Sequence, residues 1–263
     1  RLFAVSDRGV INLDDPAADA MLADALCPCL TFSCEKDAAD LTARNIGLHA
    51  DGVSFLANTR GELARVRLAI PGHFSVENAL AALGIALQLD MPLADAAKAL
   101  ATATGVKGRV EVVPTDTDYT VLIDYAHSPD GVENVLRAVR GFAKGRVVAL
   151  FGCGGDRDRT KRPKMGAIAA ALSDFCIVTS DNPRTEEPQA IIDDILEGMK
   201  DTKTPTRVIV DRPEAIRWAL AHARKEDIIV LMGKGHETYQ EVNHVKHHMD
   251  EREIVADYFA DRK

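Results

Sequence analysis

Hydrophobic runs and amphipathic stretches alternate regularly along the second half of the chain. Each run is a nearly continuous series of Val, Ile and Leu, which is typical of strands that helices cover on both faces. The stretches between the runs carry apolar residues at helical spacing. This alternation predicts an α/β fold with a Rossmann-like, doubly wound, mostly parallel sheet over residues 108–263. The runs are YTVLIDYA (119–126), RVVALFG (146–152), FCIVTS (175–180), TRVIVD (206–211) and DIIVLMG (227–233).

The first part of the chain shows short strands followed by two helices. LFAVS and VINLDDP are strand-like, and IGLHADGVSFLANTRGELARVRLAI predicts a hairpin with its turn at ADG. Two helices follow, and we expect Ser75 to cap the first of them. These elements predict a partial α/β domain over residues 1–107, which the linker TGVKGR joins to the domain at 108–263. The predicted helices are FSVENALAALGIALQL (74–89) and PLADAAKALAT (92–102).

Composition and charge narrow the classes of protein. The 263 residues are 46% hydrophobic and 27% charged, as in ordinary globular proteins. A net charge of -8 argues against a nucleic-acid partner, because such affinity needs clustered Lys and Arg. The longest apolar stretch is too short to cross a bilayer, and no signal peptide opens the chain. We therefore expect a cytoplasmic protein without a membrane partner. The strand-like opening indicates a piece of a longer protein.

Cysteine and histidine spacing does not predict a metal site. The 5 cysteines lack the paired CxxC spacing of zinc sites, and their odd number argues against a disulfide framework. His244, His247 and His248 have no thiols at ligand spacing. We therefore assign no metal-ligating residue.

Polar connections follow the predicted strands, and parallel strands bring such connections to one edge of the sheet. Open α/β sheets bind their ligands at that edge. Solvent exposure alone would explain the polarity, but the gathering of basic residues on an acidic chain favours a site for an anionic ligand. The connections are DYAHSPD (124–130), GCGGDRDRTKR (152–162), SDNPRTEEP (180–188), VDRPE (210–214) and MGKGHETYQ (232–240), with the basic residues Arg157, Arg159, Lys161, Arg162, Arg184, Arg212 and Lys234.

The connection at 180–188 carries the most distinctive side chains. Asp181, Asn182, Pro183 and Arg184 offer carboxylate acceptors, an amide, a rigid turn and a planar cationic fork within four residues. These groups suit a zwitterion that bears a carboxylate. We interpret the connection as an amino-acid recognition loop.

The other connections leave more than one interpretation open. GCGGDRDR allows close backbone approach to an anion, or it is a tight turn in which Asp156 caps the next helix. Asp124 ends an apolar strand, so its carboxylate is expected to be buried and hydrogen-bonded. His127 is either a donor to a phosphate or a capping partner. Glu237 binds a ligand ammonium or forms an ordinary surface ion pair.

Two common nucleotide-binding motifs are missing from the sequence. GCGGDR is not the GxGxxG signature, and no GxxxxGK[ST] loop occurs in the chain. If ATP is used, the loop that holds its β- and γ-phosphates is expected in another part of a longer protein.

The succession of motifs resembles the Mur ligases. GRVEV, DYAHSPD, FGCGGDRDRTKRPKMG, TSDNPRTEEP and MGKGHETYQ follow the order and spacing of that family, and FSVENALAA resembles part of its central ATPase domain. The resemblance covers essentially the whole chain. It implies a ligase of peptidoglycan synthesis that uses ATP and Mg²⁺. Such a ligase phosphorylates the carboxylate of a UDP-N-acetylmuramoyl-dipeptide and joins an amine to the acyl phosphate. The chain alone, without a phosphate loop, is expected to be inactive.

Within this family, DNPR marks the members that add meso-2,6-diaminopimelate. The resemblance therefore implies an amino-acid site and a nucleotide site, with no catalytic residue assigned in this chain. The residues implied for meso-diaminopimelate are Arg157, Asp181, Asn182, Pro183, Arg184, Gly233 and Glu237, and those implied for ATP are Asn78, Arg109, Asp124 and His127.

Two alternatives remain open. The added amino acid is lysine, or the protein is another ligase of this kind, such as a folylpolyglutamate or cyanophycin synthetase. Arg184 discriminates here, because lysine lacks the second carboxylate that an arginine would pair with. The other alternative is a noncatalytic module that binds a nucleotide or an amino acid. Binding measurements with meso-diaminopimelate, lysine and ADP separate these possibilities.

Overall fold

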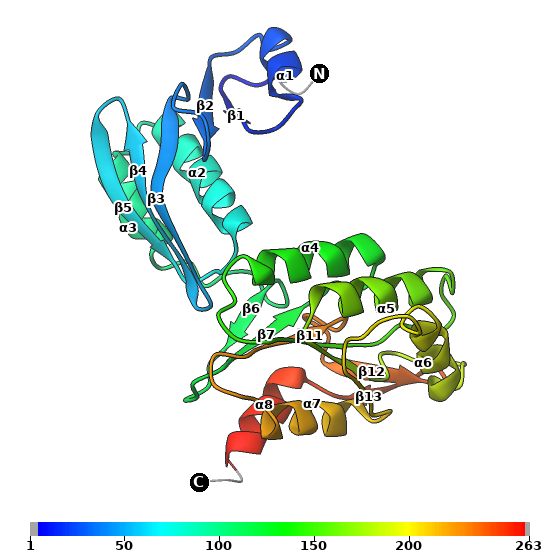
Figure 1. The fold of residues 1–263 in the computed structure, drawn as a ribbon. Coiled ribbons are helices and arrows are strands. Elements are labelled where there is room, and N and C mark those ends of the chain that lie inside the picture. Colours follow the sequence, from blue (N-terminus) through cyan, green and yellow to red (C-terminus); the bar gives the residue numbers. More distant parts are fainter. Residues whose placement is uncertain (1–4, 261–263) are drawn as a thin grey trace. The chain divides into compact units, whose positions relative to one another are not determined.

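The computed structural model describes residues 5–260, and its contacts divide the chain into two compact units, residues 1–104 and 105–263. Both units combine a β-sheet with helices (Figure 1). The predicted strand LFAVS falls mostly on residues 1–4, outside the described residues.

A five-stranded mixed sheet forms the first unit. Its order is β1-β2-β3-β4-β5, with the first three strands parallel and the last three antiparallel. The predicted hairpin is confirmed, since His49 pairs with Gly52 across its turn. The elements are β1 (Gly9–Asn12), α1 (Ala18–Ala23), β2 (Cys29–Ser33), β3 (Leu41–His49), β4 (Gly52–Thr59), β5 (Glu62–Leu68), α2 (His73–Gln88) and α3 (Leu93–Leu100).

The start of α2 corrects one prediction. The helix begins at His73, after Gly72 with a φ of 97°. Ser75 lies inside the first turn, where its hydroxyl donates to Pro71 O at 3.0 Å. The prediction of Ser75 as the N-cap is therefore wrong. The chain instead enters the helix through a backbone conformation that glycine adopts easily.

A six-stranded sheet forms the second unit, in the order β10-β9-β8-β11-β7-β6. All its strands are parallel except β6, which pairs antiparallel with β7 at one side. Helices α4, α5 and α6 cover one face, and α7 and α8 cover the other (Figure 1). The predicted α/β fold with a doubly wound, mostly parallel sheet is confirmed. The elements are β6 (Glu111–Val113), β7 (Thr120–Asp124), α4 (Pro129–Arg140), β8 (Val147–Phe151), α5 (Lys161–Leu172), β9 (Phe175–Val178), α6 (Pro188–Glu197), β10 (Thr206–Val208), α7 (Arg212–Ala221), β11 (Ile228–Met232), β12 (Tyr239–Val242), β13 (Val245–His248) and α8 (Glu251–Ala260).

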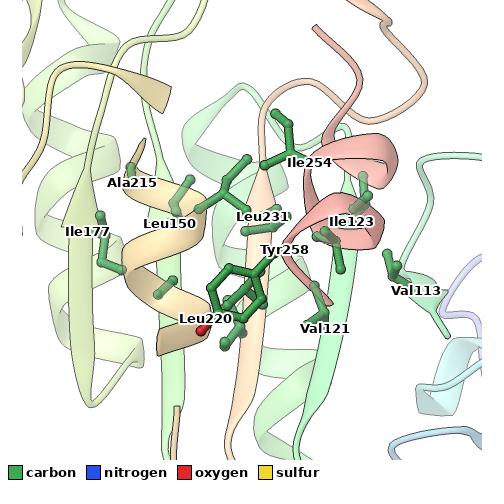
Figure 2. Close-up of a cluster of buried hydrophobic side chains, with 14 of the residues drawn as sticks. Val113, Val121, Ile123, Leu150, Ile177, Ala215, Leu220, Leu231, Ile254 and Tyr258 are labelled. Atoms are coloured by element: carbon green, nitrogen blue, oxygen red, sulfur yellow. The ribbon is translucent and has the colours of Figure 1, made fainter. Parts of the chain in front are cut away.

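Alternate strand residues of this sheet pack against α7 and α8 (Figure 2). Val121 and Ile123 of β7 face Ile254 and Tyr258 of α8, and Leu220 of α7 belongs to the same buried cluster. Burial of apolar surface stabilises such a core by about 25 cal/mol per Å². The core therefore fixes the strands, and with them the edge from which the connections leave.

The strand order creates a switch point in this sheet. β11 lies between β7 and β8, and β8 lies between β11 and β9. Because these strands are parallel and in register, the connections after all four leave from the same edge. The helix after β8 and the helix after β11 lie on opposite faces, which is the arrangement at which α/β sheets bind ligands.

Candidate functional site

Hydrogen bonds join the connection after β8 to the connection after β9. Arg184 directs its guanidinium at the glycine-rich connection, where Nη1 donates to Gly155 O at 2.8 Å. Gly155 N donates to Asn182 O at 2.9 Å. Thr185 Oγ1 donates to Asp156 Oδ1 at 2.7 Å. Asp156 thus links the two connections. The alternative that it caps the next helix is wrong, since α5 begins further along without a side-chain cap.

A buried lysine joins the connection after β11 to the same residues. Lys234 is fully buried, and its ammonium donates to Asn182 Oδ1 and Glu237 Oε2, both at 2.8 Å. Asn182 Nδ2 donates to the same Glu237 oxygen at 2.9 Å. Burial pushes the pKa of Glu237 upward, but the hydrogen bonds from Lys234 and Asn182 outweigh it, so the pKa is lowered. Glu237 is therefore a charged carboxylate that is held through one of its two oxygens.

A second buried ion pair ties the ends of β9 and β11 together. Arg212 and Glu251 are both fully buried, and Arg212 Nε donates to Glu251 Oε1 at 2.8 Å. Arg212 Nη2 donates to Met232 O at 2.8 Å, and Nη1 donates to Ser180 O at 3.4 Å. Burial raises the pKa of Glu251. Since these two carbonyls belong to the first residues of two of the connections, the pair helps to fix the distance between the connections.

Two glycines allow the connections to approach each other closely. Gly233 has a φ of 113°, and a Cβ at this position would lie 2.5 Å from Asp181 Oδ2. A Cβ on Gly155 would lie 1.9 Å from Pro183 O. A side chain at either position would push the connections apart. Gly233 and Pro183 therefore contribute backbone shape to the site.

The hairpin β12–β13, which sequence reasoning missed, closes this arrangement. Arg184 N donates to Glu241 O at 3.0 Å, and Glu241 N donates to Asn182 Oδ1 at 2.9 Å. Arg184 has a φ of 53°, a left-handed backbone conformation that residues other than glycine adopt only where the surrounding structure holds them. In the sequence, this hairpin could have been predicted from Asn243, which lies at its turn between two short runs of strand-forming residues. We call Asn182, Arg184, Lys234, Glu237 and Glu241 the edge cluster.

The residues predicted for meso-diaminopimelate meet at this edge of the sheet. Asn182 and Glu237 are hydrogen-bonded to each other. Arg157 and Arg184 border the same glycine, because a Cβ on Gly154 would lie 2.9 Å from Arg184 Nη1 and 3.9 Å from Arg157 Cγ. The Arg157 and Arg184 side chains therefore both border the glycine-rich connection.

Fewer cations are available at this edge than the sequence predicted. Three of the basic residues expected to face a ligand, Arg162, Arg212 and Lys234, are fully buried and bonded inside the protein. These three lie at the predicted edge, but each pairs with a carboxylate of the protein. Arg157 is exposed, and its Nη1 donates to the adjacent Asp156 O at 3.0 Å. Arg184 keeps 18% of its side chain exposed.

Asp124 holds the turn that follows β7. Its carboxylate is buried, with Oδ2 accepting from Val110 N at 2.8 Å and Oδ1 accepting from Ala126 N at 2.7 Å. Burial raises the pKa of Asp124, against the opposing effect of these two bonds. The expectation of a buried, hydrogen-bonded carboxylate at this strand end is confirmed.

The other residues predicted for the nucleotide are exposed. Arg109 lies over the Tyr125 ring, with 5.4 Å between Cζ and the ring centroid. The His127 ring lies 4.7 Å from the same ring, centroid to centroid. Asn78 belongs to the first unit, where it is exposed on α2.

Residues 5–260 contain neither a metal-binding cluster nor a membrane-spanning helix. No group of three or more His, Cys, Asp or Glu side chains in this range is arranged to hold a metal ion. No helix of the same range has both the length and the apolar character that crossing a membrane requires.

Comparison with known proteins covers both units. The Mur ligase middle domain matches residues 1–86, and the Mur ligase, glutamate ligase domain matches residues 108–235. The chain belongs to the Mur ligase family. The second of these matches contains Asn182, Arg184 and Lys234 of the edge cluster.

Several relatives within the Mur ligase family share one name. The chain is 44% identical over 256 residues to the UDP-N-acetylmuramoyl-L-alanyl-D-glutamate–2,6-diaminopimelate ligase of Clostridioides difficile, a match that covers 96% of this chain and 53% of the relative. The ligase of the same name from Caldanaerobacter subterraneus is 46% identical over 262 residues, which cover 99% of this chain and 54% of the relative. A solved structure of a ligase with this name has a TM-score of 0.78 and 36% identity, covering 97% of this chain and 53% of that one. The chain thus spans about half the length of the curated relatives it matches.

Proposed function

We propose that this protein provides the amino-acid site of an ATP-dependent ligase that adds meso-2,6-diaminopimelate to UDP-N-acetylmuramoyl-L-alanyl-D-glutamate in peptidoglycan synthesis. The names of its relatives support this assignment. The observation that carries it is the meeting of Arg184, Asn182 and Glu237 at one edge of the sheet, bonded across three connections. Opposite charges from separate segments are what recognition of a zwitterionic amino acid requires.

The charges of meso-diaminopimelate match this arrangement. The molecule has two carboxylates and two amines. Arg157 and Arg184 offer planar donor forks, which bind carboxylates in a fixed geometry. Glu237 Oε1, opposite the oxygen held by Lys234, is proposed to accept a hydrogen bond from an ammonium. Asp181, Asn182, Pro183 and Gly233 are proposed to shape the pocket around these contacts.

Holding the ligand at both ends is the chemical contribution proposed for this site. Amide formation needs one amine that is neutral and directed at an activated carboxylate. Fixing the remaining charged groups of the amino acid restricts its orientation, and such proximity lowers barriers by several kcal/mol, up to about 7–11 kcal/mol in favourable cases. ATP would supply the phosphoryl group that activates the peptide carboxylate as an acyl phosphate.

The residues proposed for the nucleotide fit that role to different degrees. Arg109 and His127 keep exposed donors at the end of β7, which suits a phosphorylated ligand. Asp124 holds the backbone between them, and Asn78 offers an exposed amide. We assign no magnesium ligand among residues 5–260, because this range has no cluster of metal-binding side chains.

Arg184→Ala tests the proposed substrate. Titration calorimetry of the 263-residue chain should show meso-diaminopimelate binding weakened about 30-fold or more, since loss of a partly buried charge partner costs about 2–5 kcal/mol. Lysine binding should change less than about threefold, because lysine has no second carboxylate to lose a partner. Arg217→Ala, an exposed arginine of the same unit, serves as the control and should change neither.

The outcomes separate the alternatives. Equal losses for both ligands would favour a lysine-adding ligase. Tight binding of ADP alone by the unaltered chain, with no response to either amino acid, would favour a nucleotide-binding module instead.

A further inference from the structure

Glu241 brings an unassigned carboxylate to the proposed site. Its Oε2 lies 3.3 Å from Arg184 Nε, and the two side chains are 21% and 18% exposed. Arg184 Nη1 is bonded to Gly155 O, and among residues 5–260 the Nη2 group donates to no acceptor. One side of the guanidinium therefore faces Glu241, and the end of the fork stays open to a ligand.

We propose that Glu241 is a specificity-determining residue that pairs with Arg184 to bind one complete amino-acid end of meso-diaminopimelate. Arg184 takes the carboxylate of that end, and Glu241 takes the ammonium on the same carbon. This inference rests on the proposed function and adds a ligand contact that none of the sequence motifs contained.

The spacing of the two charges fits such an end. In an α-amino acid, the ammonium nitrogen and a carboxylate oxygen are about 3 Å apart, as the lengths of the connecting bonds dictate. The nitrogen and oxygen that pair Arg184 with Glu241, Nε and Oε2, are 3.3 Å apart. A zwitterionic end can therefore lie against the pair with each group near its opposite charge.

Charge balance favours a zwitterion over a bare carboxylate. Arg184 and Glu241 neutralise each other when no ligand is bound. A ligand carboxylate alone would leave one excess negative charge in a half-buried place, where screening by water is reduced. An amino-acid end adds both charges and keeps the balance. The pair thus selects against ligands that carry only one of the two groups.

The backbone of the hairpin holds Glu241 in position. Glu241 N donates to Asn182 Oδ1 at 2.9 Å, and Asn243 N donates to Arg184 O at 2.7 Å. Gln240 Nε2 donates to Asp181 O at 2.6 Å. Replacement of the Glu241 carboxylate by an amide leaves these backbone bonds in place, so it tests the charge rather than the fold.

Glu237 and the backbone of Glu241 are joined through Asn182. Asn182 lies between them, since it donates to Glu237 and accepts from the backbone of Glu241. Buried Lys234 already pairs with Glu237, whereas the one ion pair of Glu241 within residues 5–260 is with Arg184. An ammonium has three donors, so a bond to Glu241 leaves others for Glu237.

The test compares three ligands that differ at one end. meso-Diaminopimelate has a carboxylate and an amine there, 2-aminopimelate has only the carboxylate, and lysine has only the amine. Calorimetry, or ligand-observed NMR for weak binding, measures each against the 263-residue chain and its Glu241→Gln variant. The unaltered chain should prefer meso-diaminopimelate over both other ligands. Glu241→Gln should reduce the preference over 2-aminopimelate at least about tenfold, because its amide cannot balance the ammonium charge.

Glu111→Gln is the matched control for this experiment. The Glu111–Arg252 pair has nearly the same exposure, 22% and 17%, and lies in the same unit. The control should leave the ratio of the two affinities unchanged, even if it lowers stability. If Glu241→Gln keeps the unaltered preference for meso-diaminopimelate, the role of Glu241 is refuted while the proposed function stands. If the unaltered chain shows no preference for meso-diaminopimelate over lysine, both are refuted.

Discussion

Buried charges differ between the two ends of the strands in the six-stranded sheet. We call these ends the amino edge, where the parallel strands begin, and the carboxyl edge, where they end and the connections leave. At the amino edge, Asp227 is 1% exposed and accepts from the Arg146 guanidinium and from the backbone N–H groups of Arg146 and Arg224. At the carboxyl edge, Arg212 and Glu251 are fully buried, yet Glu251 Oε2 has no hydrogen-bond partner among residues 5–260. The amino edge is thus closed by satisfied groups, whereas the carboxyl edge retains unused hydrogen-bonding capacity.

The distribution of buried charge supports the same distinction. Burying a charge costs free energy unless it is paired, and hydrophobic replacements are often more stable. Within residues 105–260, the fully buried cations lie at or beside the carboxyl edge and bind its connections. They are Arg162, Arg212 and Lys234.

Replacing one arginine at each edge should give the largest change in the free energy of unfolding. Arg212→Met leaves buried Glu251 without its cation and should lower the free energy of unfolding by about 3–5 kcal/mol. Arg146→Met should cost less, about 1–3 kcal/mol, because two backbone N–H groups still bond Asp227. Urea denaturation, followed by the fluorescence of the single tryptophan Trp218, measures both.

Ligand titration sharpens this first prediction. Only the substitution at the carboxyl edge should weaken binding of meso-diaminopimelate, since only Arg212 bonds the carbonyls that precede the ligand connections. If Arg212→Met does not fold, Arg212→Lys is measured in its place, because it retains the positive charge but loses the planar guanidinium. Equal binding losses at both edges would contradict the comparison.

Two lysine–glutamate pairs with the same sequence spacing provide the next test. Lys234 and Glu237 are 0% and 15% exposed, whereas Lys200 and Glu197 are 64% and 59% exposed. Lys234→Met should cost about 2–3 kcal/mol, because Glu237 and Asn182 both lose a partner, and should weaken meso-diaminopimelate binding about tenfold. The same measurement on Lys200→Met should show a change within about 0.5 kcal/mol. Equal losses of unfolding free energy in Lys234→Met and Lys200→Met would show that burial does not cause the difference expected between the two pairs.

The smallest expected change in stability comes from the titration of Glu186. The hydrogen bond from Arg162 lowers the pKa of Glu186 from 4.5 to about 2. A folded-state pKa below the unfolded value stabilises the protein above pH 4.5, and this stability is lost as the pH falls toward about 2. The loss should be about 1 kcal/mol, as for a partly exposed ion pair. Unfolding free energies between pH 5 and 2 should depend less on pH in Glu186→Gln than in the unaltered chain, and parallel curves would refute this assignment.

Much of the fold could be predicted because strand and helix periodicities are local. Apolar runs such as 147–151 and 228–232 mark buried strands wherever helices cover both faces of a sheet. The start of α2 was predicted wrongly because Gly72 and Ser75, three positions apart, are both residues that can precede a helix. Local signals define which element forms more reliably than where it begins.

The candidate site was predictable in part. Asn182, Arg184 and Glu237 lie in motifs that follow strand ends, so the sheet topology brings them together. Glu241 lies in no such motif, and it reaches Asn182 across 59 residues of sequence. Its contribution depends on how the hairpin folds back, which no local pattern specifies.

The sequence by itself determined the alternation of strands and helices from β7 to β11, the family and the edge at which its polar connections gather. Only the tertiary structure decided which charges are fully buried. Arg162, Arg212 and Lys234 look the same in the sequence as Arg157 and Arg184, yet the first three are buried against internal partners. The reason is that desolvation and pairing depend on neighbours brought together by folding, whereas residue type sets only the charge that must be accommodated.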